Sequence, residues 1–156
     1  MTYTIGLERG DENYWELEPN YRRHYAEMKE RLAKDGIEVS DYAPRLEQYF
    51  TAFKGGWLLN YVARFNGEPV GHCNVYLTND MHNGDLIAQE DVLYVVPEHR
   101  NGLGKRLVRH VLSDLEARGV RRVSVMALTD LRVAKIWRRI GFKDTAQMMT
   151  YTFGGR

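Results

Sequence analysis

One stretch of the sequence constrains the fold more than any other: an apolar run that leads into a basic turn with two glycines. Val95 and Val96 end the run, Gly102 and Gly104 lie in the turn, and a helical pattern starts at Leu103. Glycine adopts backbone conformations that other residues avoid and puts no Cβ between chain and ligand. The N–H groups that a starting helix leaves unpaired, and the positive end of its dipole, attract anions. The segment therefore predicts a phosphate site between a strand and a helix.

Two other phosphate-binding motifs are excluded by the residues that follow this turn. A dinucleotide fingerprint of the Rossmann type needs a third small residue where Leu107 stands. A P-loop needs serine or threonine after its lysine, but Arg106 follows Lys105. Arg100, Lys105 and Arg106 still bring positive charge to the turn, so an anion remains the expected ligand.

The residues after the turn predict a helix, a strand, a second helix and a last strand. Apolar residues recur at helical spacing over 103–115, and Gly119 is expected to end that helix. Residues 120–126 predict a strand. The second helix is expected over 133–140 with Thr129 or Asp130 as its cap, followed by Gly141-Phe142 and a strand that reaches residue 153.

The N-terminal part predicts an edge strand over residues 2–8 and two helices. The first helix is expected to begin at Pro19, because proline suits a first turn. Ser40 is expected to cap the second helix, and Gly55-Gly56 to end it. Aromatic residues at helical spacing are usually core residues, and on these two helices they are Tyr21, Tyr25, Tyr42, Tyr49, Phe50 and Phe53.

A β-hairpin is expected in the middle of the chain. Asn66-Gly67 is a strong turn signal, and residues 57–64 and 69–77 flank it as strands. A polar loop over 79–85 then leads to a strand at about 87–96, which runs into the glycine turn.

With its flanks, the turn resembles the coenzyme-A-binding motif of the GNAT superfamily of N-acetyltransferases: Gln or Arg, two residues, Gly, one residue, then Gly or Ala. Gly102 and Gly104 match the two small positions. His99 stands where the family has Gln or Arg, and Arg100 follows one step later, so the turn is one residue shorter than usual. The resemblance covers roughly residues 57 to 153.

This resemblance implies an α/β fold in a single domain over residues 1–156. The sheet would be mixed and mostly antiparallel, with one splayed strand pair and flanking helices. The implied activity is transfer of acetyl from acetyl-CoA to an amine by direct attack in a ternary complex. In the family, the two N-terminal helices also roof the acceptor pocket.

The resemblance also implies how coenzyme A would be held. Main-chain groups of the strand before the turn would pair with the pantetheine arm, and the N–H of Val95 would stabilise the developing oxyanion. The implied cofactor contacts are Leu93, Tyr94, Val95, His99, Arg100, Asn101, Gly102, Leu103, Gly104, Lys105, Arg106 and Trp137.

The amine must lose a proton before it attacks, because a lysine-like ammonium has a pKa of about 10.4. Alternation along the strand predicts that Asp91 shares a face with Leu93 and Val95, whereas Glu90 points the other way. Some family members place a catalytic Glu at the position of Asp91. Asp91 is therefore expected to act as base through water, or only to bind the substrate cation, and Glu90 is the second catalytic candidate.

The proton donor departs from the family pattern. Many members carry a tyrosine four residues before Gly-Phe to protonate the thiolate, but this position is Trp137, whose indole N–H is no acid at neutral pH. A thiol pKa of about 8.5 makes the thiolate a tolerable leaving group without such an acid. Water, the substrate ammonium, Tyr94 or Tyr151 could take this role, and Tyr151 is the catalytic candidate.

A narrower resemblance concerns small GNAT proteins of phages and prophages, which show a similar order of His24, the Met81-His82-Asn83 loop, Asp91 and Arg100. It implies that His24, His82 and Asp91 together bind the acceptor, a small-molecule or peptide amine. Taken singly, each histidine is more often a surface or capping residue than a ligand.

The net charge of +1 hides a division along the chain. Residues 99–143 hold twelve Lys or Arg against three Asp or Glu, whereas residues 1–98 hold nine against seventeen. The basic part would suit the nucleotide and diphosphate, and the acidic part would attract a cationic amine, unless both are merely solvated faces.

Several classes are excluded or made less favourable. No apolar run nears the roughly 18 residues of a membrane span and no signal peptide is evident, so we expect a cytoplasmic protein without a membrane partner. The single cysteine, Cys73, allows no internal disulfide and fits no metal spacing.

Two alternatives to the enzyme stay open. One is a catalytically weak coenzyme A binder with a sensing or interaction role, suggested by Trp137 and the shortened turn. The other, less favoured, is a nucleic-acid-binding module, since no interleaved surface aromatics accompany the basic residues. The arginines of the nucleic-acid alternative are Arg118, Arg121, Arg122, Arg138 and Arg139.

The family resemblance also bears on oligomeric state, because family members often form homodimers.

Overall fold

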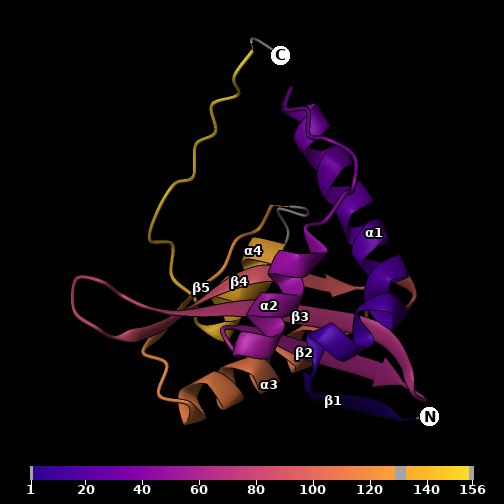
Figure 1. Ribbon diagram of the computed structural model, residues 1–156, viewed down its shortest axis with the longest axis vertical. Helices are drawn as coiled ribbons and strands as arrows, with labels where there is room; N and C mark the ends of the chain where they lie inside the picture. Colours follow the sequence, from indigo (N-terminus) through magenta and orange to yellow (C-terminus); the bar gives the residue numbers. More distant parts are fainter. Residues whose placement is uncertain (1, 129–132, 155–156) are drawn as a thin grey trace.

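Five strands form one mixed sheet in the order β1-β2-β3-β4-β5 (Figure 1). The computed structural model describes residues 2–128 and 133–154. The first four strands are antiparallel neighbours, and the fifth runs parallel to the fourth. The α/β fold with a mostly antiparallel sheet is thus confirmed. The strands are β1 (Tyr3–Glu8), β2 (Leu58–Phe65), β3 (Glu68–Asn79), β4 (Leu86–Val95) and β5 (Arg122–Ser124).

Helices cover both faces of the sheet. Successive residues of a strand point to opposite faces. Leu58 of β2 packs with Ala52 and Phe53, whereas Leu59 packs with Leu107 and its neighbours. The first two helices therefore lie on one face and the third on the other. The helices are α1 (Gly10–Lys34), α2 (Leu46–Gly55), α3 (Leu103–Ala117) and α4 (Val133–Ile140), with a 3-10 turn η1 (Pro97–His99) before α3.

The first helix begins at Gly10, nine residues before the predicted start at Pro19. Pro19 lies inside α1, where it removes one main-chain hydrogen bond. Packing offsets this loss, because Tyr14 and Leu17 are only 4% and 0% exposed. A side chain at Gly10 would bring its Cβ within 2.4 Å of the Phe53 ring, so the start of α1 requires glycine.

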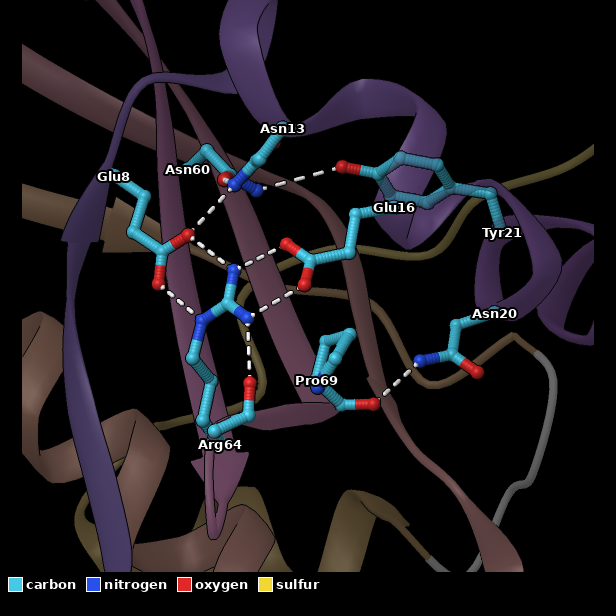
Figure 2. Close-up of polar contacts among 9 residues, drawn as sticks. Glu8, Asn13, Glu16, Asn20, Tyr21, Asn60, Arg64 and Pro69 are labelled. Atoms are coloured by element: carbon cyan, nitrogen blue, oxygen red, sulfur yellow. Dashed lines mark hydrogen bonds and ion pairs between the residues drawn. The ribbon is translucent and has the colours of Figure 1, made fainter.

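A polar network fixes α1 to the sheet (Figure 2). The Arg64 guanidinium donates to Glu8 of β1 at 2.8 and 2.9 Å and to Glu16 of α1 at 2.6 and 2.9 Å. Asn20 of α1 donates to the Pro69 carbonyl at 3.0 Å. These contacts hold the N-terminal half of α1 against β1, β2 and β3 at a defined angle.

The second helix begins at Leu46 rather than near Ser40, and Arg45 occupies its N-cap position. Pro44 explains the late start, because a proline disfavours helical backbone in the residue before it. The predicted end is correct, since Gly56 adopts the left-handed conformation that closes the helix, with φ 76°.

The hairpin and the edge strand are confirmed. Asn66 and Gly67 both have positive φ, 49° and 88°, as a tight two-residue turn between β2 and β3 requires. β1 lies at the edge of the sheet and pairs only with β2.

The C-terminal part differs from the sequence prediction. β5 holds three residues, against the expected 120–126, and residues 143–152 form no strand. In Figure 1 this segment, drawn in yellow, runs away from the sheet. A strand needs a paired neighbour, and β5 offers only a short edge. The proposed helix caps Thr129 and Asp130 lie outside the described residues.

Candidate active site

β4 carries a bulge where its pairing with β3 shifts register. Val75 pairs with Glu90 and Asn74 pairs with Val92, so Asp91 is left without a partner on β3. An extra residue of this kind changes the local direction of side chains and is common beside active sites.

The bulge makes one sequence prediction wrong. Strict alternation would place Asp91 on one face with Leu93. Glu90 and Leu93 instead pair with Val75 and Cys73, so both lie on the face that α3 covers. Asp91 lines a cavity on the opposite face, below α1 and α2.

From Glu90 onward, β4 is not paired with β5. The two strands pair only over Ile87–Gln89, whereas β4 continues to Val95. The opening holds a cavity of about 410 Å³ between β4, α1, the glycine turn and α4. The splayed strand pair expected from the resemblance is therefore present. The lining residues are His24, Glu27, Met28, Glu90, Asp91, Leu93, Tyr94, Val95, Arg100, Gly102, Gly104, Lys105, Met126, Ala127, Leu128, Val133, Ile136, Trp137 and Arg139.

Main-chain groups of β4 face this large cavity. The Val96 N–H donates to the Val70 carbonyl of β3 at 2.9 Å. Main-chain groups of successive residues point to alternate sides of a strand, so the N–H and C=O of Val95 point away from β3. The Val95 carbonyl accepts a hydrogen bond of 2.7 Å from Arg100 Nε, which agrees with this direction.

The glycine turn forms the basic end of the large cavity. Gly102 precedes α3 with φ 95°, a backbone conformation that would be strained in a residue with a side chain. The Arg106 N–H makes a bond of 3.2 Å to the Gly102 carbonyl, the first of the helix. The N–H groups of Leu103, Gly104 and Lys105 therefore have no intrahelical acceptor. They provide an anion site at the positive end of α3.

Arg100 connects this turn to α1. Besides its bond to Val95, its Nη2 lies 3.2 Å from both carboxylate oxygens of Glu27, and its guanidinium lies 5.3 Å from the centre of the Tyr94 ring. The Arg100 side chain thus spans the large cavity next to the glycine turn.

Four of the predicted cofactor residues direct their side chains elsewhere. His99 Nδ1 lies 2.7 Å from the Tyr3 hydroxyl, and the Arg106 guanidinium lies over the ring of the same tyrosine at 5.7 Å. Leu103 is a core residue with 1% exposure, and Asn101 is exposed outside the lining. These side chains pack against β1 or the core, or face solvent. At these positions α3 therefore presents main-chain groups, not side chains, to the large cavity.

A second cavity of about 230 Å³ lies below α1 and α2. It shares three lining residues with the large cavity: His24, Met28 and Asp91. The two cavities therefore meet at these side chains. The small cavity is lined by Tyr14, Tyr21, His24, Tyr25, Met28, Tyr42, Tyr49, Phe53, Asn74, Asp91 and Val92.

The Asp91 carboxyl is half-buried next to Glu90, and no cation pairs with it among the described residues. Within residues 2–128 and 133–154, no hydrogen bond or ion pair to its side chain is present. Burial raises the pKa of Asp91 to about 6, because the charged form loses hydration. At neutral pH it is mostly ionised and can accept a proton.

Glu90 lines only the large cavity, at the point where β4 and β5 separate. Burial raises the pKa of Glu90 to about 7, while a hydrogen bond from the Met126 N–H opposes that shift. Its Oε2 is buried and has no partner among the described residues. Glu90 thus joins β4 to the wall formed by residues 126–128.

The two histidines predicted to bind the acceptor lie in different environments. Burial, and next the charge of Arg100, lower the pKa of His24 to about 4, so His24 is neutral beside Asp91. His82 lies in the β3–β4 loop, where its side chain is 96% exposed and bonds to Asp80. The structure brings together His24 and Asp91 but not His82, because the loop extends beyond the sheet.

The two proton-donor candidates also separate. Tyr151 lies in the C-terminal segment with 81% exposure and reaches neither cavity, because that segment leaves the sheet. Tyr94 lines the large cavity, and its buried hydroxyl has no partner among the described residues. Trp137 is 4% exposed in the wall, and its Nε1 is likewise unpartnered there.

Sequence reasoning missed the far wall and most of the small cavity. The strand predicted over 120–126 includes Met126 but not Ala127 or Leu128, and no local signal indicates that these three residues diverge from β4 to line the large cavity. The tyrosines were seen at helical spacing, but spacing does not distinguish a core face from a cavity wall.

The lining fits coenzyme A. Free N–H groups and basic side chains at one end suit a diphosphate, and the open main chain of β4 suits an amide-containing arm. A model of the acetyltransferase (GNAT) family matches residues 14–142. The chain belongs to this family. It is a GNAT-family acetyltransferase, and the acetyl donor of the family is acetyl-CoA.

Solved structures of such enzymes share the fold of this acetyltransferase. A GCN5-related N-acetyltransferase from Ralstonia eutropha JMP134 superposes with a TM-score of 0.75 at 18% identity, covering 98% of this chain and 100% of that one. A ribosomal-protein-alanine N-acetyltransferase from Brucella melitensis biovar Abortus 2308 superposes with a TM-score of 0.72 at 17% identity, covering 96% of this chain and 99% of that one.

A third structure, of a predicted acetyltransferase from Clostridium acetobutylicum with acetyl-CoA, superposes with a TM-score of 0.70 at 15% identity. The match covers 97% of this chain and 96% of that one. Among the curated proteins, none matches this sequence. In the part of the chain that the structure describes, no helix has the length and apolar character of a membrane span.

Proposed function

We propose that this acetyltransferase passes the acetyl group directly from acetyl-CoA to a primary amine, with both substrates bound at once and Asp91 as the proton acceptor. The position of Asp91 carries the proposal. Its unpaired carboxyl lies where the large cavity, which fits the donor, meets the small cavity below α1 and α2.

Burial favours proton transfer from the amine to Asp91. It raises the pKa of the Asp91 carboxyl to about 6, and it lowers the pKa of an ammonium that leaves water for the same site. Both shifts reduce the gap of roughly six pKa units that separates an exposed carboxyl from an exposed amine. Asp91 also attracts the incoming cation before that transfer.

Main-chain geometry supports Val95 as the oxyanion donor. Acetyl-CoA, when bound, supplies an acetyl group activated as a thioester. An N–H that points away from β3 into the large cavity is fixed in place and needs no reorganisation during the reaction, which is where such donors are most effective. Glu90 positions this strand by accepting a hydrogen bond from the Met126 N–H, which connects β4 to residues 126–128 across the opening.

The nucleic-acid alternative receives no support from the basic residues that suggested it. Arg118, Arg122 and Arg138 each form an ion pair with a carboxylate, and Arg139 lines the large cavity. A purely coenzyme-A-binding role would leave Asp91 with a burial cost and no use.

The test replaces the proton acceptor. Asp91→Asn keeps the shape of the side chain and should lower kcat about 100-fold or more, as expected for loss of a general base. Calorimetry should show an unchanged Kd for acetyl-CoA. Asp35→Asn, at the exposed end of α1, is the matched control and should behave as the unaltered enzyme.

Two results would contradict the proposal. An unaltered kcat in Asp91→Asn would remove this carboxyl from proton transfer. Initial-rate plots at varied concentrations of both substrates should intersect, since parallel lines would indicate a covalent acetyl-enzyme in place of direct transfer.

A further inference from the structure

We infer that the acceptor is a small primary amine that carries one positive charge on a compact aromatic body, an arylalkylamine. Its ammonium would lie at Asp91 and its ring among the aromatic side chains below α1 and α2. This inference rests on the proposed function, because it names the class of amine that enters the small cavity.

The small cavity presents mostly ring faces and edges. Six of its eleven lining residues are aromatic. The Tyr14 and Tyr42 hydroxyls bond to each other at 2.6 Å, and the Tyr25 hydroxyl donates to the Ser40 carbonyl at 2.5 Å. These bonds use part of the hydrogen-bonding capacity of the hydroxyls, so these tyrosines offer mainly carbon surface.

The Tyr21 hydroxyl oxygen is held in place as an acceptor (Figure 2). It accepts from Asn60 Nδ2 at 3.4 Å and from Asn74 Nδ2 at 3.3 Å. Asn60 also donates to Asn74 Oδ1 at 2.6 Å and accepts from Asn13 at 2.8 Å. Asn60 and Asn74 are 1% and 2% exposed, so a buried network holds the Tyr21 ring before any ligand arrives.

The rings also pack against one another around the space. Tyr14 stacks on Tyr21 with centroids 5.5 Å apart, and Tyr25 lies 5.5 Å from Tyr42. Aromatic groups prefer offset or edge contacts with other rings, and an ammonium is attracted to ring faces. A fixed aromatic enclosure of this kind favours a flat apolar body with an attached cation.

Charge in the lining limits the ligand to a single cation. Asp91 is the one carboxylate among the lining residues, and neither lysine nor arginine is among them. His24 is neutral there. The carboxylate of a free amino acid would find no cation, and a second ammonium would find no carboxylate. Zwitterions, polyamines and multiply charged aminoglycosides are therefore disfavoured.

Size points the same way. The cavity of about 230 Å³ is smaller than the roughly 300–1,000 Å³ of pockets for drug-sized ligands. A single ring with a short aminoalkyl chain suits this space better than several linked sugar rings.

The first experiment compares amines in matched pairs, with release of the coenzyme A thiol as the measurement. Phenethylamine should have a kcat/KM at least about tenfold above that of phenylalanine, which adds only a carboxylate. Hexylamine should exceed 1,5-diaminopentane by a similar factor, because the second charge is unmatched. Preference for the diamine, for an aminoglycoside or for a peptide N-terminus would overturn the inference.

The second experiment changes the wall of the small cavity. Tyr49→Leu should raise the KM for phenethylamine about tenfold and leave the KM for acetyl-CoA unchanged, whereas Tyr49→Phe should restore it. Phe153→Leu, in a ring that is 89% exposed, is the control. An equal KM in Tyr49→Leu and the unaltered enzyme would place the acceptor elsewhere.

The two proposals fail differently. If another amine class is acetylated well, with loss of activity in Asp91→Asn, the proposed function stands and the arylalkylamine class is wrong. If calorimetry shows acetyl-CoA binding but no amine of any class releases the thiol, the proposed function itself is wrong and this inference falls with it.

Discussion

The two cavities that meet at Asp91 are built from opposite parts of the polypeptide. The large cavity uses main-chain groups of β4 and the start of α3, with a few cations around them. The small cavity uses side-chain rings from α1, α2 and the segment between them. Under the proposed function, recognition of the donor thus depends on backbone conformation, whereas recognition of the acceptor depends on residue identity. Substitutions on the two sides should therefore have separable effects on the two substrates.

The largest effect is expected at the backbone of the donor side. Gly102→Val forces a β-branched residue into a φ of 95° and should weaken acetyl-CoA binding about 30-fold by calorimetry, because the N–H groups of α3 shift. Gly84→Val imposes similar strain at φ 78° in the β3–β4 loop and should leave that Kd unchanged. Equal affinity in both variants would contradict a main-chain anion site.

The next effect concerns the residue that both sides share. Asp91 must be ionised to accept a proton, and its pKa is about 6. The value of kcat/KM should therefore fall about tenfold per pH unit below pH 6 and level off above pH 7. Measurement from pH 5 to 8 checks this, and Asp91→Asn should lose the inflection. An inflection that persists in the variant would belong to another group.

A smaller pair of changes should have opposite signs. Arg100→Ala should weaken acetyl-CoA binding about fivefold, because one charge-assisted contact disappears. Glu27→Gln should tighten it about twofold, since Arg100 would no longer be held at 3.2 Å by that carboxylate. Binding titrations measure both. Weaker binding in Glu27→Gln would mean that Arg100 acts from its present position.

The smallest effect is on stability. The pKa of Asp91 in the folded protein lies above its ordinary value. Its ionisation therefore lowers the free energy of unfolding as the pH rises through about 6. Asp91→Asn should raise the free energy of unfolding at pH 8 by about 1–2 kcal/mol, since the carboxyl keeps some solvent contact, which is about 2–6 °C in Tm. The gain should vanish near pH 4, and a variant destabilised at pH 8 would contradict a cost of burying this charge.

The sequence predicts the donor side well because its parts are contiguous. Strand, turn and helix follow one another over about a dozen residues, and glycine, basic and apolar residues each have a local physical meaning there. Arg100, Gly102 and Lys105 accordingly lie at the large cavity. His99 was misplaced because Tyr3, almost a hundred residues away in sequence, provides its partner.

The acceptor side could not be predicted to the same extent, because tertiary contacts define it. Pro19 and Ser40 suggested helix starts that packing and Pro44 override. Tyr151 was a candidate only under the assumption of a last strand, and the short β5 gives that strand no long edge. The direction of Asp91 depends on a bulge in β4, and no local sequence signal distinguishes a bulged strand from a regular one.

Under the proposed function, that bulge makes activity depend on the number of residues in β4 as well as on their identity. Deletion of a single residue from β4 would restore even pairing with β3 and leave the hydrophobic layers intact. The same deletion would remove the carboxyl or rotate it toward α3. A homologue that aligns here with a one-residue gap should consequently keep the architecture and the nucleotide pocket while lacking the means to deprotonate an amine.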